Sequence, residues 1–433
     1  MSLRTAIMSR LTQYLTSSER QAAARAKAER RRVARGEAHV VEYFHDASDP
    51  YSYLVSQILG EFVQRYDVHV EIHLVAPPPD WAAPEREQLA DWSRLDAQRL
   101  AEKAGLNFQD PGKTPSAEVI AQAESEFLDA LDKGAFVQQA ARIGGTLWGG
   151  GLSGNDKPPR EDVPFRKGKG SARREALGHY LGATFHYAGE WYWGLDRLHY
   201  LEARLLALGA VKPGCSETPI FAPPVSPAPS VTDRVPEGTE IHYYLSFRSP
   251  YTYIVAERVK ALAQSYGARL RLRFVLPMVM RGLPVPRMKG MYITKDTARE
   301  ARRLGVPFGK IADPVGEPVE RGYSLLPWAI SQERGFEFCL SFMRKVWSEG
   351  IDAGSAKGME AIVAGAGLSW EHARSMLGRG DWRAEAEVNR AEMSELGLWG
   401  VPSFRVGNVY TWGQDRLWVI EDELKRLARE DKA

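Results

Sequence analysis

Ser249 is the residue of this chain best placed to act on a sulfur nucleophile. It follows the strand-like run EIHYYLSFR and is the first residue of Ser-Pro-Tyr-Thr, where an amphipathic helical pattern begins. Free N–H groups and the helix dipole gather at a helix N-terminus, so this position favours negative charge. The hydroxyl could donate to a bound thiolate and lower the pKa of the thiol. The alternative is that Ser249 and Pro250 form only an N-cap and a first-turn proline.

Asp49 stands at the equivalent place in an internal repeat. The segment VVEYFHDASDPYSYLVSQIL begins at Val40 and EIHYYLSFRSPYTYIVAERV at Glu240, which places Asp49 and Ser249 200 positions apart. A carboxylate would repel a thiolate, so we expect Asp49 to cap its helix and not to activate a thiol. A protonated or general-base aspartate stays open as an alternative.

The repeat organises the rest of the chain. Strand-like segments VHVEIHLV and RLRLRFVL come next, and LGATFHYAGEWYWGLDRL and WGVPSFRVGNVYTWGQDRL each predict a strand, a Gly turn, a strand and a helix. The middle of each half has a helical pattern, but the Gly/Pro-rich residues 144–170 predict little helix. We therefore expect a basic N-terminal helix, a first half, a proline-rich linker and a second half, at residues 1–36, 37–210, 211–238 and 239–433.

Composition predicts a globular protein of two domains. The chain has 433 residues, 44% of them hydrophobic and 26% charged, and a net charge of +2 that does not favour nucleic acid as a partner. Cys215 and Cys339 form no CxxC or zinc motif, and the histidines show no ligand spacing, so we expect no metal. No signal-peptide or membrane-spanning apolar run is evident, which predicts a cytoplasmic protein without disulfides.

The N-terminal segment is basic and amphipathic. Leu3, Ile7, Leu11 and Leu15 recur every four residues among many arginines. One interpretation is a helix that docks on a protein partner or on a membrane surface. The other, which we favour, is an exposed helix packed on its own protein, or a frayed terminus.

Four ordered motifs of the second half resemble 2-hydroxychromene-2-carboxylate isomerases and kappa-class glutathione transferases. They are SPYTYIVAERV, MKGMY at Met288, GVPSF and TWGQDRL, within a similarity that spans residues 240–427. The first half resembles the family only in its skeleton. The resemblance implies an α/β protein of two tandem thioredoxin-like (DsbA-type) domains, each with an inserted helical subdomain. Ser249 then replaces the first cysteine of a CxxC motif, and without a thiol pair this site cannot exchange disulfides.

The resemblance also implies a glutathione site in the second half, with Ser249 as its catalytic residue. Val401 and Pro402 match a cis-proline turn that presents the Val401 backbone to the cysteinyl unit. Gln414 and Asp415 match the part that holds the γ-glutamyl end, although Asp415 could be only a first-turn acid. Lys289 matches a lysine that faces the glycyl carboxylate. The family asparagine expected a few residues earlier is absent from VMRGLPVPRM, which puts the pose of glutathione in doubt.

The first half lacks three of these features. Asp49, Ala183 and Leu89 stand where the second half has Ser249, Pro402 and Lys289. We therefore expect the first half to be a degenerate domain without this glutathione site.

An aromatic co-substrate is the expected partner of the second half, in a pocket assigned to Tyr251, Tyr292 and Trp328, unless these side chains belong to the core. The leading hypothesis is a glutathione-dependent isomerase of the 2-hydroxychromene-2-carboxylate isomerase type. The alternatives are a kappa-like glutathione transferase and a non-catalytic binding or scaffold protein. Duplication also suggests that the two halves pack as an intramolecular pseudo-dimer, a hypothesis that crosslinking or scattering would test.

Overall fold

The computed structural model describes residues 3–151, 158–224 and 234–430, which form two compact units. One unit is Ala24–Pro223 and contains the first half; the other joins Met1–Ala23 to Pro224–Ala433 and contains the second half. The division falls inside the segment predicted as a linker, part of which lies outside the described residues. The domain boundaries given above stay a prediction.

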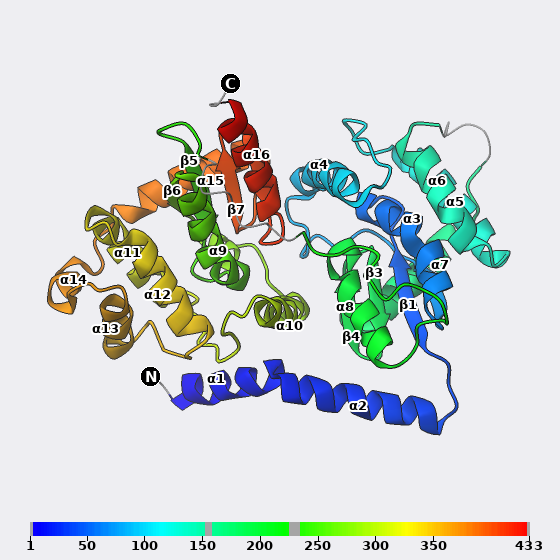
Figure 1. The fold of residues 1–433 in the computed structure, drawn as a ribbon, viewed down its shortest axis with the longest axis horizontal. Coiled ribbons are helices and arrows are strands. Elements are labelled where there is room, and N and C mark those ends of the chain that lie inside the picture. The colour runs from blue at the N-terminus through cyan, green and yellow to red at the C-terminus, as the bar shows by residue number, and fades with distance from the viewer. Residues whose placement is uncertain (1–2, 152–157, 225–233, 431–433) are drawn as a thin grey trace. The chain divides into compact units, whose positions relative to one another are not determined.

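The first half is a mixed four-stranded sheet with helices packed on it (Figure 1). The strand order is β2-β1-β3-β4, with β1 parallel to β2 and antiparallel to β3. Its strands are β1 (Val40–His45), β2 (His69–Leu74), β3 (Thr184–Tyr187) and β4 (Glu190–Trp193). Its helices are α3 (Pro50–Arg65), α4 (Arg86–Ala104), α5 (Ala117–Asp132), α6 (Phe136–Trp148), α7 (Val163–Ala176) and α8 (Gly194–Ala207).

The second half repeats this sheet with the order β6-β5-β7-β8 and the same strand directions. Its strands are β5 (Glu240–Leu245), β6 (Arg269–Phe274), β7 (Ser403–Val406) and β8 (Val409–Trp412). Its helices are α9 (Pro250–Tyr266), η1 (Met278–Arg281), α10 (Arg287–Arg303), α11 (Glu317–Ser331), α12 (Gly335–Trp347), α13 (Ala356–Gly365), α14 (Trp370–Met376), α15 (Trp382–Glu395) and α16 (Leu417–Glu430). Helices α13 and α14 lengthen this half, so matched residues lie 200 positions apart as far as the start of α11 and 219 apart from α15 on.

Both helices that start the repeat begin as the sequence predicts. Asp49 caps α3 by accepting from the Tyr51 N–H, and Ser249 caps α9 by accepting from the Thr252 N–H. Pro50 and Pro250 follow, and proline is tolerated there because the first helical N–H has no partner inside the helix. The central strands β1 and β5 are buried on both faces, while β2 and β6 alternate in burial as edge strands do.

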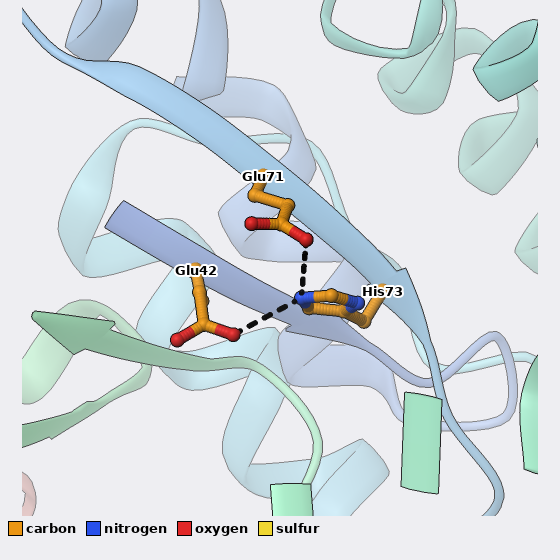
Figure 2. A group of neighbouring side chains, drawn as sticks. All are labelled: Glu42, Glu71 and His73. Carbon is orange, nitrogen blue, oxygen red and sulfur yellow. Dashed lines mark ion pairs between the residues drawn. The ribbon is translucent and has the colours of Figure 1, made fainter. Parts of the chain in front are cut away.

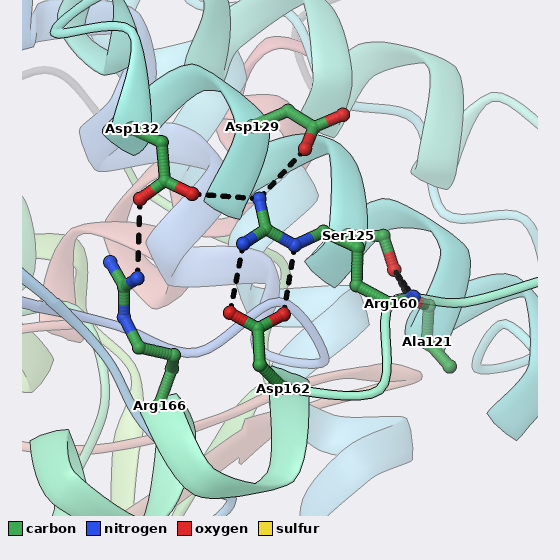
Figure 3. Close-up of polar contacts among 7 residues, drawn as sticks. All are labelled: Ala121, Ser125, Asp129, Asp132, Arg160, Asp162 and Arg166. Carbon is green, nitrogen blue, oxygen red and sulfur yellow. Dashed lines mark hydrogen bonds and ion pairs between the residues drawn. The ribbon is translucent and has the colours of Figure 1, made fainter.

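The Gly/Pro-rich stretch at 144–170 is helical at both ends, which corrects the prediction of little helix there. Helix α6 runs to Trp148 and α7 starts at Val163. Arg160 holds the start of α7 by ion pairs from its guanidinium to Asp129, Asp132 and Asp162, at 2.7–2.8 Å (Figure 3). A side chain at Gly170 would collide with the Leu74 carbonyl oxygen, so glycine lets α7 lie close to β2.

The N-terminal segment forms two helices, α1 (Leu3–Thr16) and α2 (Ser18–Ala34). Helix α1 packs through hydroxyl side chains: Ser9 and Thr16 are buried, and the Thr12 hydroxyl accepts from the Ile311 N–H at 3.1 Å. Ile7 and Leu11, two of the four residues in the predicted apolar pattern, are instead exposed. The helix therefore packs on its own protein, as favoured above, but not through its apolar pattern.

Candidate functional site

The Ser249 hydroxyl lies at the N-terminus of α9 and faces the loop before β7. Its Oγ donates to the Val401 carbonyl oxygen at 3.1 Å and accepts from the Thr252 N–H at 3.2 Å. The Val401–Pro402 peptide bond is cis, as predicted. Ser249 and Val401 are both partly exposed, while Pro402 is buried. The structure thus brings together three of the predicted site residues, and leaves the hydroxyl and the Val401 backbone within reach of a ligand.

Thr252 adds a polar atom that sequence reasoning missed. Its side chain is fully buried, and its Oγ1 has no hydrogen-bond partner among the described residues. In the first half the matched Ser52 hydroxyl accepts from the Ala183 N–H at 3.0 Å. Pro402 replaces Ala183 and carries no N–H, which explains why Thr252 lacks this bond. The sequence contained a signal for this, the difference between Ala183 and Pro402. Only the fold shows that the N–H at this position would bond to the hydroxyl at the position of Ser52 and Thr252.

Lys289 lies near the same loop. It is buried in α10, with its Nζ 5.7 Å from the centre of the Trp399 ring, and Trp399 comes two residues before Val401. Burial lowers the pKa of Lys289 to about 8. A buried ammonium at this place could bind a carboxylate, the role that the resemblance implies.

Gln414 belongs to a buried polar cluster. Its Nε2 donates to the Glu300 carboxylate at 2.9 Å, and its Oε1 accepts from the Arg258 guanidinium at 3.1 Å. Glu300 also pairs with Arg303 at 2.8 Å. The amide of Gln414 therefore joins α9 to α10, and it has hydrogen-bond capacity left at one N–H. Asp415, the next residue, is partly exposed, as is Arg258. Burial and the charge of Arg303 lower the pKa of Arg258, and the charge of Asp415 acts against them.

The three predicted pocket residues lie on three different helices. The Tyr251 hydroxyl donates to Asp296 at 2.8 Å, and the matched Tyr51 donates to Asp96 at 2.7 Å in the first half. This shared bond gives Tyr251 a structural role. Trp328 packs against the core and Tyr292 is partly buried in α10. Their pocket role stays a prediction.

A pocket of about 220 Å³ was not predicted from the sequence. It is lined by Leu276, Arg281, Ala386, Glu387 and two further arginines, Arg383 and Arg390. Leu276 follows β6 closely, and Arg281 donates to the Trp399 carbonyl oxygen at 3.4 Å. The carboxyl ends of the parallel strands β5 and β6 meet at one edge of the sheet, so the pocket and Ser249 lie toward the same edge.

The second half matches a known family in comparisons with other proteins. Residues 240–425 match the DSBA-like thioredoxin domain. This half of the chain carries a DsbA-like domain. The 2-hydroxychromene-2-carboxylate isomerase of Pseudomonas putida is 24% identical over 207 residues, which cover 44% of this chain and 97% of the relative. The isomerase of the same name from Sphingobium xenophagum is 24% identical over 198 residues, 42% of this chain and 97% of the relative.

Solved structures give weaker matches. A 2-hydroxychromene-2-carboxylate isomerase aligns with a TM-score of 0.39 and 22% identity, over 45% of this chain and 98% of its own. The cytosolic disulfide reductase DsbM from Pseudomonas aeruginosa, solved with GSH, aligns with a TM-score of 0.35 and 19% identity, over 44% of this chain and 98% of its own. Among the described residues, no helix has the length and apolar character needed to span a membrane.

The first half has a different site at the position of Ser249. The Asp49 carboxylate accepts from the Tyr51 N–H and from the Ser52 hydroxyl, each at 3.1 Å. Burial, and next the charge of Asp46, raise the pKa of Asp49 to about 7. Gly182 packs against both aspartates, so the loop before β3 closes over them. The capping role expected for Asp49 is confirmed.

On one face of the first sheet, Glu42, Glu71 and His73 bring side-chain ligand atoms within 4.8 Å of one another (Figure 2). Both oxygens of Glu42 accept from the Arg173 guanidinium, at 2.7 and 3.0 Å. Burial would raise the pKa of Glu42, but hydrogen bonds from His186, His73 and Arg173 hold it well below its usual range. We interpret this group as an ion-pair cluster that fastens α7 to the sheet, because Glu42 already has a cation.

Proposed function

We propose that the DsbA-like domain is a glutathione-dependent isomerase that acts on an aromatic electrophile. The observation that carries the proposal is the Ser249 hydroxyl, held at the N-terminus of α9 and 3.1 Å from the Val401 carbonyl oxygen. The similarity to proteins named 2-hydroxychromene-2-carboxylate isomerase supports an isomerase over a transferase. Bound glutathione would supply a thiolate nucleophile for the aromatic co-substrate.

The residues on this edge of the sheet fit glutathione in most of its parts. Val401 would pair through its backbone with the cysteinyl unit, and Lys289 would bind the glycyl carboxylate. Asp415 would accept from the γ-glutamyl ammonium, with the free N–H of the Gln414 amide available to the neighbouring carboxylate. Because Gln414 is shared with Glu300 and Arg258, it acts more as a positioning residue than as a direct ligand.

Ser249 would exchange one hydrogen-bond acceptor for another on binding. In the free protein its proton is directed to the Val401 carbonyl oxygen. A ligand that pairs with the Val401 backbone would compete for that oxygen, so the hydroxyl could turn and donate to a thiolate. The helix dipole and the Ser249 hydroxyl would together favour the ionised thiol. The pocket beside Arg281 offers an apolar wall and arginines for an anionic aromatic co-substrate.

Calorimetric titration of glutathione tests the proposal, with the ultraviolet absorbance of the thiolate followed in parallel. We expect saturable binding and a thiolate signal near neutral pH, which Ser249→Ala removes. Ser355→Ala is the matched control, because Ser355 caps α13 by accepting from the Gly358 N–H and its loss should leave the signal intact. No binding at millimolar glutathione, or an unchanged signal in Ser249→Ala, would contradict the proposal.

We further propose that the two halves arose by duplication of one thioredoxin-like domain. The shared strand order, the shared register and the paired Tyr51–Asp96 and Tyr251–Asp296 bonds support this origin. A cytoplasmic location also belongs to the proposal: both Cys215 and Cys339 are free thiols, which fits a reducing compartment.

A further inference from the structure

The first half contains a buried cation where the DsbA-like domain has an apolar side chain. Helices α7 and α15 correspond residue by residue, 219 positions apart, so Arg174 of the first half matches Met393 of the second. Both side chains are buried: Arg174 is 4% exposed and Met393 1%. Methionine is thus compatible with this place in the fold, and packing does not require arginine. A buried guanidinium carries a large desolvation cost that hydrogen bonds or ion pairs must offset.

Among the residues that the structure describes, most of the Arg174 guanidinium has no acceptor. Its Nη2 donates to the Ala76 carbonyl oxygen at 3.1 Å, whereas Nε and Nη1 are buried and have no hydrogen-bond partner. These two atoms carry three of the five N–H donors of arginine. Neighbouring Arg173, in contrast, has both oxygens of Glu42 as acceptors. Buried polar groups are nearly always satisfied, so Arg174 indicates an acceptor other than the described residues.

Arg174 lies near the end of β1: it donates to the Ala76 carbonyl oxygen, and the N–H of the preceding Val75 donates to the His45 carbonyl oxygen at 2.9 Å. Burial raises the pKa of Asp46 and lowers the pKa of Arg174, and the opposite charge of each group acts against that shift in the other. Asp46 is buried and accepts from the Ser48 N–H and hydroxyl, and its own N–H donates to Ser52. Asp49, at the position of Ser249, lies beside it. The unsatisfied cation therefore points toward the edge that carries Ser249 in the DsbA-like domain.

The other charged groups around this edge are largely paired. Lys167 of α7 pairs with the buried Glu124 of α5 at 2.6 Å, and both lie close enough to Asp46 to act on it electrostatically. Glu175, the residue after Arg174, is exposed. With Asp46 and Asp49 ionised, the site around Arg174 has an excess of negative charge. A dianion such as phosphate would be repelled, whereas a single carboxylate could share a proton with Asp49.

We propose that the first half binds a small molecule through one carboxylate, which accepts hydrogen bonds from Arg174 and lies beside Asp46 and Asp49. The half that lacks the glutathione features is then a second binding domain with its own ligand class, independent of the chemistry at Ser249. The pKa of Asp49 is about 7, so Asp49 is mostly ionised above this pH. Binding of a carboxylate beside it then requires Asp49 to take up a proton. Affinity for the carboxylate should rise about tenfold between pH 8 and pH 6, following the neutral fraction of Asp49.

The Nε–H signal of Arg174 in nuclear magnetic resonance of the full chain tests the proposal, with acetate as the probe and acetamide as its neutral isostere. We expect a saturable shift with acetate at pH 6, a tenfold weaker effect at pH 8, and no shift with acetamide. Arg174→Met should lose the signal and remain folded, because Met393 occupies the matched place. Lys169→Met, which removes an exposed cation from the same helix, should keep the response.

Three results would overturn parts of the proposal. No shift of the Arg174 signal with acetate would remove the site, whatever glutathione does at Ser249. An equal or larger shift with inorganic phosphate would replace the carboxylate by another anion class. A pH dependence that persists in Asp49→Asn would show that Asp49 does not take up the proton.

Discussion

The two halves of this chain share a fold but bury their polar groups in different places. In the first half three charged residues lie near the edge that matches the position of Ser249: Asp46, Asp49 and Arg174. In the DsbA-like domain a polar cluster of Arg258, Glu300 and Gln414 joins α9 and α10 to the residues before α16. Matched positions show the exchange: Asp46, Asp49 and Arg174 against Ser246, Ser249 and Met393, and Ile58, Leu100 and Leu195 against Arg258, Glu300 and Gln414.

The face of the sheet under α7 and α15 shows the same freedom with the signs reversed. Arg173 of α7 pairs with Glu42 of β1, whereas Glu392 of α15 pairs with Arg405 of β7 at 2.8 Å and Arg273 of β6 at 3.5 Å. Either sign fastens the helix to the sheet, because an ion pair depends on complementarity and not on which element carries the acid. The ion pairs on this face are therefore structural, in contrast to Arg174, whose guanidinium is mostly unpaired among the described residues.

The largest expected effect comes from converting the polar cluster of the DsbA-like domain toward that of the first half. Glu300→Leu alone should destabilise the protein by about 4 kcal/mol, because it leaves the buried Gln414 amide without its acceptor and Arg303 without its acid. The triple change Arg258→Ile, Glu300→Leu, Gln414→Leu should recover most of this loss, since it installs the apolar set of the first half. Chemical denaturation measures the stability of both variants. A triple variant no more stable than the single one would show that the apolar residues of the first half cannot replace the polar cluster of the second.

The next effect concerns Asp49 and depends on pH. Its folded pKa of about 7 lies above the ordinary aspartate value, so the folded protein holds a proton that the unfolded chain releases, and stability falls as pH rises from about 4 to 7. Asp49→Asn keeps a capping side chain and should stabilise the protein by about 3 kcal/mol at pH 8 and far less at pH 5. Calorimetry at the two pH values checks this. Asp80→Asn, at an exposed aspartate, should show no such pH dependence, and an equal gain at both values would contradict the assignment.

Two glycines of α7 test how closely this helix packs on its sheet, compared with α15. Gly170 touches the Leu74 carbonyl oxygen where the matched Asn389 donates its Nδ2 to the Phe274 carbonyl oxygen at 3.1 Å. Gly170→Ala should cost about 2 kcal/mol because the helix must move off the sheet. Gly168→Ala on the same helix meets nothing within 4 Å and should stabilise by up to about 1 kcal/mol. Equal melting temperatures for the two variants would show that α7 does not pack closely on β2.

The smallest effect tests what the halves hold in common. Tyr51→Phe and Tyr251→Phe each remove one hydroxyl bond to an aspartate and should each cost about 1 kcal/mol of unfolding free energy. Equal losses support a structural role for both. A change in the co-substrate KM in Tyr251→Phe, with unchanged stability, would instead restore Tyr251 to the predicted pocket.

Much of the fold and part of the candidate site could be predicted because their signals are local. The repeat, the caps Asp49 and Ser249, and the X-Pro turn at Val401–Pro402 each depend on a few adjacent residues whose backbone preferences are strong. The prediction of little helix in residues 144–170 is wrong because it depends on local propensity alone. Local propensity disfavours helix there, but Arg160 and the fit of Gly170 against Leu74 favour it through distant partners.

By itself, the sequence determined that two similar α/β halves exist, that the second carries the family motifs, and which residues begin the two matched helices. Only the tertiary structure placed Arg174 near Asp46, Gln414 against Glu300, and Ser249 against Val401, because such pairs are more than a hundred residues apart. Whether the two residues of each pair come together depends on how each helix packs on its sheet. The inserted α13 and α14 also change the sequence offset between matched residues of the two halves. Long-range packing therefore decides where each half places its buried charges, and that placement distinguishes one half from the other.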